Sequence, residues 1–251
     1  MTNRRFHAML KRGGRFTSHP NLKGQILLKA RLTVIAKSDK HTGYCVAAMD
    51  EKGGIIRLVR DKEGHALTEE QCRFRKLDRI LADITHAPLK HQRENYVLNE
   101  LLEVLPPKLT ADGLTAFFHD WAHIFGNENP WLTEEEMQRQ RVTFIFAEVS
   151  DLRIYENDEE KMKADFVYRG KEHKGFSITD PAFKARERQI KRAALLFSLP
   201  DAAYTRYGNE LYYKFICAVY PLKAAEKALD CYRIGGHRAD FYDWLYEEKC
   251  A

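Results

Sequence analysis

The chain has 251 residues, of which 44% are hydrophobic and 31% charged, and its formal net charge at pH 7 is +5. This balance is ordinary for a globular protein and excludes a chain that is disordered throughout. No apolar run approaches the roughly 18 residues that a membrane-spanning helix needs, so we expect a soluble, cytoplasmic protein that does not contact a membrane.

Five cysteines are scattered along the chain, and none belongs to a C-x-x-C pair. An odd, widely spaced set argues against a disulfide framework and against a zinc ribbon. Free thiols in a reducing cytoplasm are the simplest interpretation.

The chain begins with a basic segment. Residues 1–38 contain nine lysines and arginines but no aspartate or glutamate, and residues 1–25 include Gly13, Gly14, Pro20 and Gly24. This composition predicts a flexible arm at 1–25 that would attract a polyanion. An inert solvated tail and an organelle transit peptide are the alternatives.

Residues 26–105 predict a first small β-barrel. A weak helical pattern at Thr68–Arg75 interrupts the strands, and Asp50–Gly54 is a hairpin signal. Five segments have strand character: Ile26–Ala36, Tyr44–Met49, Ile55–Val59, Leu77–Thr85 and Glu94–Glu103. Five short strands with one short helix are the inventory of a small closed barrel.

Residues 106–140 predict a helical insert that follows Pro106 and Pro107. Apolar residues at helical spacing predict a helix over Thr110–Phe125. A second helix is expected over Thr133–Gln140, which opens with the capping-box pattern Thr133-x-x-Glu136.

Residues 141–222 predict a second small barrel, and residues 223–251 a helical tail with a cluster of aromatic side chains. The expected strands are Val142–Val149, Ala164–Tyr168, Lys174–Ile178 and Leu211–Tyr220, with a basic helix from Ala182 to about Phe197. The aromatic tail either packs on a barrel or anchors a protein partner.

Three segments together resemble the dual OB-fold domain proteins of bacteria, over roughly residues 26–222. The first is a K-S-x-K-H-x-G-Y-C-V-A run at 37–47 followed by Ile55–Val59; the second is His91–Tyr96; the third is Ile178–Pro181 with the later Tyr213–Ala218. The resemblance implies tandem oligonucleotide-binding barrels and an association with bacterial anti-phage or conflict loci, and it implies no enzymatic activity. The fold class expected is therefore β-rich α+β: two small OB-like β-barrels with a helical insert, a basic N-terminal arm and a helical C-terminal tail.

A first candidate nucleic-acid-binding set lies on and beside the loop between the first two strands. Single-strand binders need cations for the phosphates and flat rings on which bases stack. The residues that could provide both are Lys37, Ser38, Lys40, His41, Tyr44, Arg57 and Arg60. The alternative is that Ser38 and His41 stabilise a turn while Tyr44 packs in the core.

A second candidate set lies on the predicted basic helix. Lys184, Arg188, Lys191 and Arg192 are three or four residues apart and would share one helical face that could contact phosphates. An ordinary solvated face of an amphipathic helix explains the same pattern.

Other chemistries have weaker support. His119 and His123 lie four residues apart but without the glutamate of H-E-x-x-H, and Cys45 with His41 makes a poor nucleophile and base. No phosphate-binding glycine loop occurs, so we predict no catalytic residue, no metal ligand and no cofactor.

We expect a non-enzymatic protein that binds DNA or RNA, as a single strand or an end, within a bacterial defence system. One alternative is a protein-interaction subunit whose barrels scaffold a multi-protein effector, and a protein partner could also bind through the arm or the aromatic tail. The other is a nuclease or hydrolase whose site the sequence does not reveal.

Overall fold

The computed structural model describes residues 17–20, 26–40, 42–106, 124–140, 142–183, 187–206 and 208–222. These residues form two compact units, which are described one at a time. The first holds the described residues up to 35, then 42–89 and 94–106; the second holds 36–40, 90–93 and those from 124 onward. No helix among the described residues is long and apolar enough to cross a membrane.

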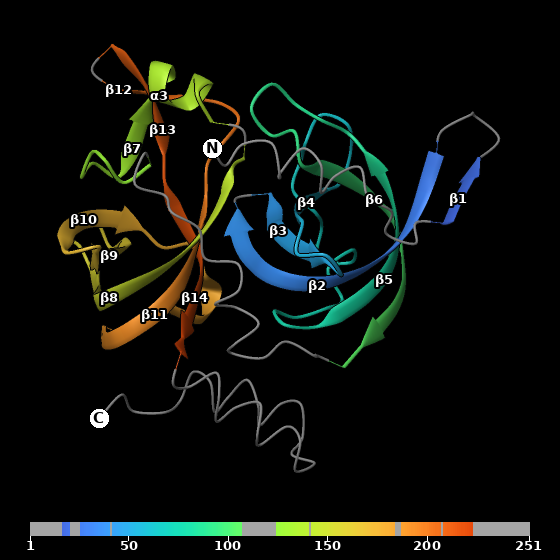
Figure 1. Ribbon diagram of the computed structural model, residues 1–251, viewed down its shortest axis with the longest axis horizontal. Coiled ribbons are helices and arrows are strands. Elements are labelled where there is room, and N and C mark those ends of the chain that lie inside the picture. The colour runs from blue at the N-terminus through green and yellow to red at the C-terminus, as the bar shows by residue number, and fades with distance from the viewer. Residues whose placement is uncertain are drawn as a thin grey trace. The chain divides into compact units, whose positions relative to one another are not determined.

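The first unit is built on a closed five-stranded barrel. Its strands are β2 (Ile26–Lys40, whose last five residues belong to the second unit), β3 (Gly43–Asp50), β4 (Ile55–Val59), β5 (Arg79–His86) and β6 (Asn95–Leu105). They are hydrogen-bonded in the order β2-β3-β4-β6-β5, and β5 pairs with β2 again, which closes the sheet (Figure 1). A short strand, β1 (Thr17–Pro20), pairs with the start of β2.

This strand order is that of an OB-fold barrel. Counting from β2, the barrel runs first-second-third-fifth-fourth, and its third and fifth strands, β4 and β6, pair in parallel. The predicted hairpin is confirmed, since the amide N–H of Asp50 donates to the carbonyl of Gly54 at 2.9 Å. The interior is apolar because alternate residues point inward, as with Val46, Ala48, Ile56 and Leu58.

The second unit contains a five-stranded sheet with the same order. Its strands are β8 (Phe144–Glu156), β9 (Met162–Tyr168), β10 (Lys171–Ser177), β11 (Arg188–Ser198) and β14 (Phe215–Pro221), with the 3-10 turn η1 (Pro181–Phe183) before β11. The sheet runs β10-β9-β8-β11-β14. Its two ends meet at a parallel bridge between Ile178 and Ile216, beside which the N–H of Thr179 donates to the carbonyl of Ile216 at 2.8 Å.

A smaller sheet is inserted into the second unit. It has the order β12 (Tyr204–Arg206), β13 (Asn209–Tyr213), β7 (Trp131–Thr133). Helix α3 (Glu134–Gln138) follows β7, and its capping box of Thr133 and Glu136 is present as predicted. Strands β12 and β13 thus occupy the connection between the fourth and fifth barrel strands, β11 and β14.

Three expectations about secondary structure are wrong. Residues 188–198 of the expected basic helix form β11, in which Ala193–Ser198 are all buried; a short apolar run buried on both faces cannot be told from a buried helix by periodicity. The single strand expected over Leu211–Tyr220 is interrupted at Lys214. Thr68–Arg75 forms turns rather than a helix.

Other expected elements cannot be compared with the structure. The predicted helix over Thr110–Phe125 lies outside the described residues except for its last two, and the C-terminal tail from residue 223 and most of the basic arm lie outside them as well. The proposed domain boundaries at 25, 105, 140 and 222 therefore stay predictions.

Candidate nucleic-acid interface

The first predicted set does not form one exposed cluster. At the end of β2, Lys40 is exposed and Lys37 half-buried, whereas the side chain of Ser38 is buried, with 3% of its surface exposed. Tyr44 is half-buried and packs against the apolar interior of the first barrel. His41 lies outside the described residues.

Arg57 lies inside the first unit rather than on a binding surface. Only 3% of it is exposed, and its guanidinium Nη1 donates to the sulfur of Cys45 at 2.9 Å. Its Nη2 lies 3.8 Å from a carboxylate oxygen of Glu94, which is itself largely buried. A buried cation needs such a counter-charge, so this placement argues against contact between Arg57 and a phosphate.

The same burial covers the outward face of β3 and β4. In OB-folds the surface of the second and third strands commonly binds oligonucleotides. Here the outward residues that alternate with the core are at most 7% exposed: Cys45, Ala47, Met49, Arg57 and Val59. The first barrel therefore does not present this surface to solvent.

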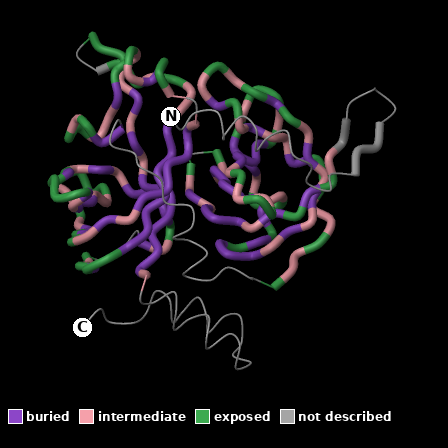
Figure 2. The backbone as a smooth tube through the Cα atoms, viewed as in Figure 1, coloured by how far each residue is buried: buried purple, intermediate pink, exposed green. Residues whose placement is uncertain are grey.

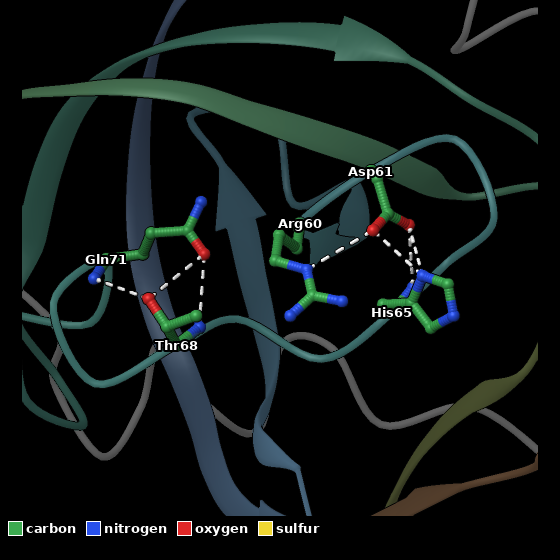
Figure 3. A network of polar contacts seen from close by, with 5 residues as sticks. All are labelled: Arg60, Asp61, His65, Thr68 and Gln71. Carbon is green, nitrogen blue, oxygen red and sulfur yellow. Dashed lines mark hydrogen bonds and ion pairs between the residues drawn. The ribbon is translucent and has the colours of Figure 1, made fainter.

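Arg60 belongs to a local network in the connection between β4 and β5 (Figure 3). Its Nε lies 3.2 Å from Asp61, whose carboxylate is also 2.8 Å from Nδ1 of His65. Partial burial raises the pKa of Asp61, but the hydrogen bonds from His65 and Arg60 outweigh this and lower it to about 2. In the same loop the backbone N–H of Thr68 donates to the side-chain oxygen of Gln71, and the backbone N–H of Gln71 donates to the hydroxyl of Thr68.

This loop also holds the one group of potential metal ligands found among the described residues, Asp61, Glu63 and His65. Their ligand atoms all lie within 4.8 Å of one another. Both carboxylate oxygens of Asp61 already contact the His65 ring. These internal contacts account for Asp61 and His65, and Glu63 is an exposed residue of the same loop.

The second predicted set is dispersed because the segment is a strand. Arg188 lies over the ring of the buried Phe183, at 5.6 Å from its centre, and Arg192 forms an ion pair with Glu148. Lys191 is exposed, and Lys184 lies outside the described residues. A helical spacing of three and four therefore does not place these side chains together.

The second barrel presents an uncovered surface where the first does not. Along β9 and β10 buried residues mostly alternate with exposed and half-buried ones (Figure 2). We call six of the outward residues of β8, β9 and β10 the open face: Arg153, Tyr155, Lys163, Asp165, Lys174 and Ser177. Strand register places Tyr155 beside Lys163 and Lys163 beside Ser177, in one row across three strands.

The open face combines a ring with cations. The guanidinium of Arg153 lies over the ring of Tyr155 at 5.1 Å from its centre, and Nζ of Lys163 donates to the Ser177 hydroxyl at 2.9 Å. Lys174 is exposed and pairs with Glu172 at 2.8 Å, a contact of little energy at such exposure. Four of the acidic residues near this surface lie in the segment 156–160, at the end of β8 and in the turn before β9.

None of the open-face residues belongs to the two sets predicted from the sequence. The available signal was the alternation of apolar and polar residues in Leu152–Tyr155 and Met162–Tyr168, which is typical of a strand with one solvated face. Because Lys163 and Ser177 are fourteen positions apart in the chain, only the strand register brings them together.

Similarity to known proteins agrees with the strand order. No match is found among curated proteins. One solved structure, titled "Crystal structure of the tetrameric p202 HIN2", is 11% identical, with 82% of this chain and 94% of that chain covered, but its TM-score of 0.32 supports no argument. The family model described as the dual OB-containing domain matches residues 30–219, which confirms the resemblance noted in the sequence. The chain belongs to the dual OB-containing domain family.

Proposed function

We propose that this protein binds single-stranded nucleic acid without catalysing a reaction, and that the open face of the second barrel is the contact surface. The observation that supports this most is the row of Tyr155, Lys163 and Ser177 with Arg153 above the ring. It lies on the first three strands of an OB-like sheet, and OB-folds bind oligonucleotides on the second and third.

Each part of the open face has a task that suits a single strand. Bases stack on aromatic rings and on guanidinium planes, and one stacked base contributes about 1–3 kcal/mol. Tyr155 and Arg153 provide such a surface. Lys163 and Lys174 provide positive charge for phosphates, and the acidic segment at 156–160 would direct the phosphate chain away from that end of the barrel.

Two lysines from the sets predicted from the sequence can add to this surface, although the proposal does not depend on them. Lys40 and Lys191 are exposed and belong to the second unit, so both can contribute further phosphate contacts. Arg57 and Ser38 are left out because they are buried. Arg192 is a weaker contact because it already pairs with Glu148.

The test is the binding of fluorescently labelled single-stranded oligonucleotides to the full chain, followed by anisotropy at several salt concentrations. We expect the double variant Arg153→Ala/Lys163→Ala to bind at least about tenfold more weakly than the unmodified protein. The slope of log K against log salt should become shallower by about 0.7, the value for one phosphate contact on a single strand, because Lys163 contacts a phosphate whereas Arg153 stacks on a base.

The matched control is Lys52→Ala/Arg139→Ala, which removes the same net charge from two exposed positions outside the open face. This control should bind as the unmodified protein does. Equal losses in both double variants would show attraction by net charge alone, and no binding by the unmodified protein would refute the function.

The remaining alternatives have separate readouts. A scaffold subunit would bind no oligonucleotide but would copurify with a defined protein, and a nuclease would cleave the labelled strand when a divalent metal is added. A role in bacterial defence is a proposal that follows from the family resemblance, and a cytoplasmic location is a proposal that follows from the scattered cysteines, none of which belongs to a C-x-x-C pair. Placement of the gene beside defence genes would support the first.

A further inference from the structure

One acidic residue lies in the middle of the open face. Asp165 is half-buried on β9 and pairs in register with Arg153 of β8, one row from Tyr155 and Lys163. A carboxylate among phosphate-binding cations weakens the attraction for every phosphate nearby. A favourable contact between Asp165 and the bound strand would offset this loss of attraction.

The carboxylate is held by two donors, and both use the same oxygen. The hydroxyl of Tyr155 donates to Oδ1 of Asp165 at 3.0 Å, and the amide N–H of Gly175 donates to Oδ1 at 2.8 Å. Among the described residues no hydrogen bond reaches Oδ2. The second oxygen is thus available to accept, at the hydroxyl end of the ring on which we propose that a base stacks.

The hydrogen bond from Gly175 gives Asp165 a structural task as well. Gly175 has a φ of 74° and lies where the register of β9 and β10 shifts, between His173 and Phe176. This task needs only Oδ1, and an asparagine could fulfil it with its amide oxygen. The structural contribution of Asp165 can therefore be separated from any role of Oδ2.

We infer that Asp165 makes the open face selective for a base that presents N–H groups on its pairing edge, with guanine preferred over the other bases. This inference depends on the proposed function, because it concerns a base that stacks on Tyr155 and Arg153. It assigns the carboxylate to reading the base rather than to binding the backbone.

The preference follows from the pattern of donors and acceptors on each base. Guanine presents two neighbouring donors, N1–H and the N2 amino group, to a carboxylate. Adenine and cytosine present one amino group beside an acceptor nitrogen. Thymine and uracil present one N–H between two carbonyl oxygens, which the carboxylate repels.

The experiment compares strands that differ at one base. Thymine strands of about twelve nucleotides, each with a central guanine, adenine, cytosine or thymine, are titrated with the unmodified protein and with Asp165→Asn. For the unmodified protein we expect the guanine strand to bind about tenfold more tightly than the all-thymine strand.

The variant should separate base reading from charge. Asp165→Asn keeps the oxygen that accepts from Gly175 and Tyr155 but places an amide NH2, which donates, where Oδ2 was. It also removes a negative charge from the open face. We expect the guanine preference to fall to about twofold or less, while the all-thymine strand binds as well as before or more tightly.

The possible failures are distinguishable. If the unmodified protein binds all four strands equally, or if Asp165→Asn keeps the guanine preference, the inference is wrong while the proposed function stands. If the unmodified protein binds none of the strands, the proposed function itself fails. A variant that lost all binding together with its thermal stability would leave the four-strand comparison on the unmodified protein as the deciding measurement.

Discussion

Replacing Lys214 with methionine should remove most of the pH dependence of the free energy of unfolding between pH 7 and 9. Lys214 lies between β13 and β14, and only 1% of it is exposed. Its Nζ donates to the carbonyl of Ile124 at 3.0 Å and to Oδ1 of Asn127 at 3.1 Å. Burial lowers the pKa of this amine from 10.5 to about 7, although the carboxylate of Glu136 acts in the opposite direction.

The sign and size of the effect follow from proton linkage. Between about pH 7 and pH 10.5 the unfolded chain holds the proton on this lysine and the folded protein releases it. The free energy of unfolding therefore rises with pH in that window, and the penalty for the buried charge is fully present below pH 7. One pKa unit corresponds to about 1.4 kcal/mol, so the rise attributable to Lys214 between pH 7 and pH 9 is about 2 kcal/mol.

The assay is urea unfolding of the full chain at pH 7, 8 and 9, with the free energy extrapolated to water. The unmodified protein should gain about 2 kcal/mol more between pH 7 and 9 than Lys214→Met does, because the other titrating groups are the same in both. Lys191→Met, at an exposed lysine, is the matched control and should follow the unmodified protein.

Parallel profiles for the unmodified protein and Lys214→Met would refute the reasoning. They would show that the folded protein keeps the proton on Lys214 throughout the range. The contacts of the amine with two oxygen acceptors and with the rings of Phe125 and Phe176, each centred 5.5 Å away, would then balance its loss of water.

Two further substitutions test buried polar groups. The imidazole of His173 is fully buried and stacked on Phe166 at 5.2 Å, and burial, aided by the charge of Lys214, lowers its pKa to about 4. At pH 5 the unfolded chain binds a proton on His173 that the folded protein does not bind, and this destabilises the fold. His173→Phe removes that penalty and should raise the melting temperature more at pH 5 than at pH 7.5. An equal change at both pH values would contradict this. Arg57→Met removes the cation beside the largely buried Glu94, so the free energy of unfolding measured in urea should fall by about 3 kcal/mol. The affinity for oligonucleotides should stay the same. A loss of affinity in a variant that is still folded would show that Arg57 belongs to the binding surface.

The sequence was most informative where turn residues separate the strands. In the first barrel the five predicted strands and the Asp50–Gly54 hairpin are all present, because turn residues and β-branched runs are local signals. The capping box at Thr133 was likewise readable from four residues. The family resemblance, which depended on short runs such as Lys37–Ala47, is confirmed over residues 30–219.

The sequence was misleading in the second half of β11, where the side chains are buried on both faces of the strand. Ala193–Phe197 read equally well as a helix, and only its pairing with β8 and β14 identifies β11 as a strand. The cations that a helix would have gathered on one face are then separated, and Arg192 pairs with Glu148 instead.

Local pattern by itself determined that this is a β-rich chain, and the short runs that resemble the dual OB-containing domain indicated two small barrels. Which cations and rings share a surface was decided by the tertiary structure alone. Arg57 and Lys163 are equally basic in the sequence, yet one is buried against Glu94 and the other lies beside Tyr155. The physical reason is that burial and strand register depend on pairings between distant segments, and a charge binds a ligand only where those pairings leave it in contact with water.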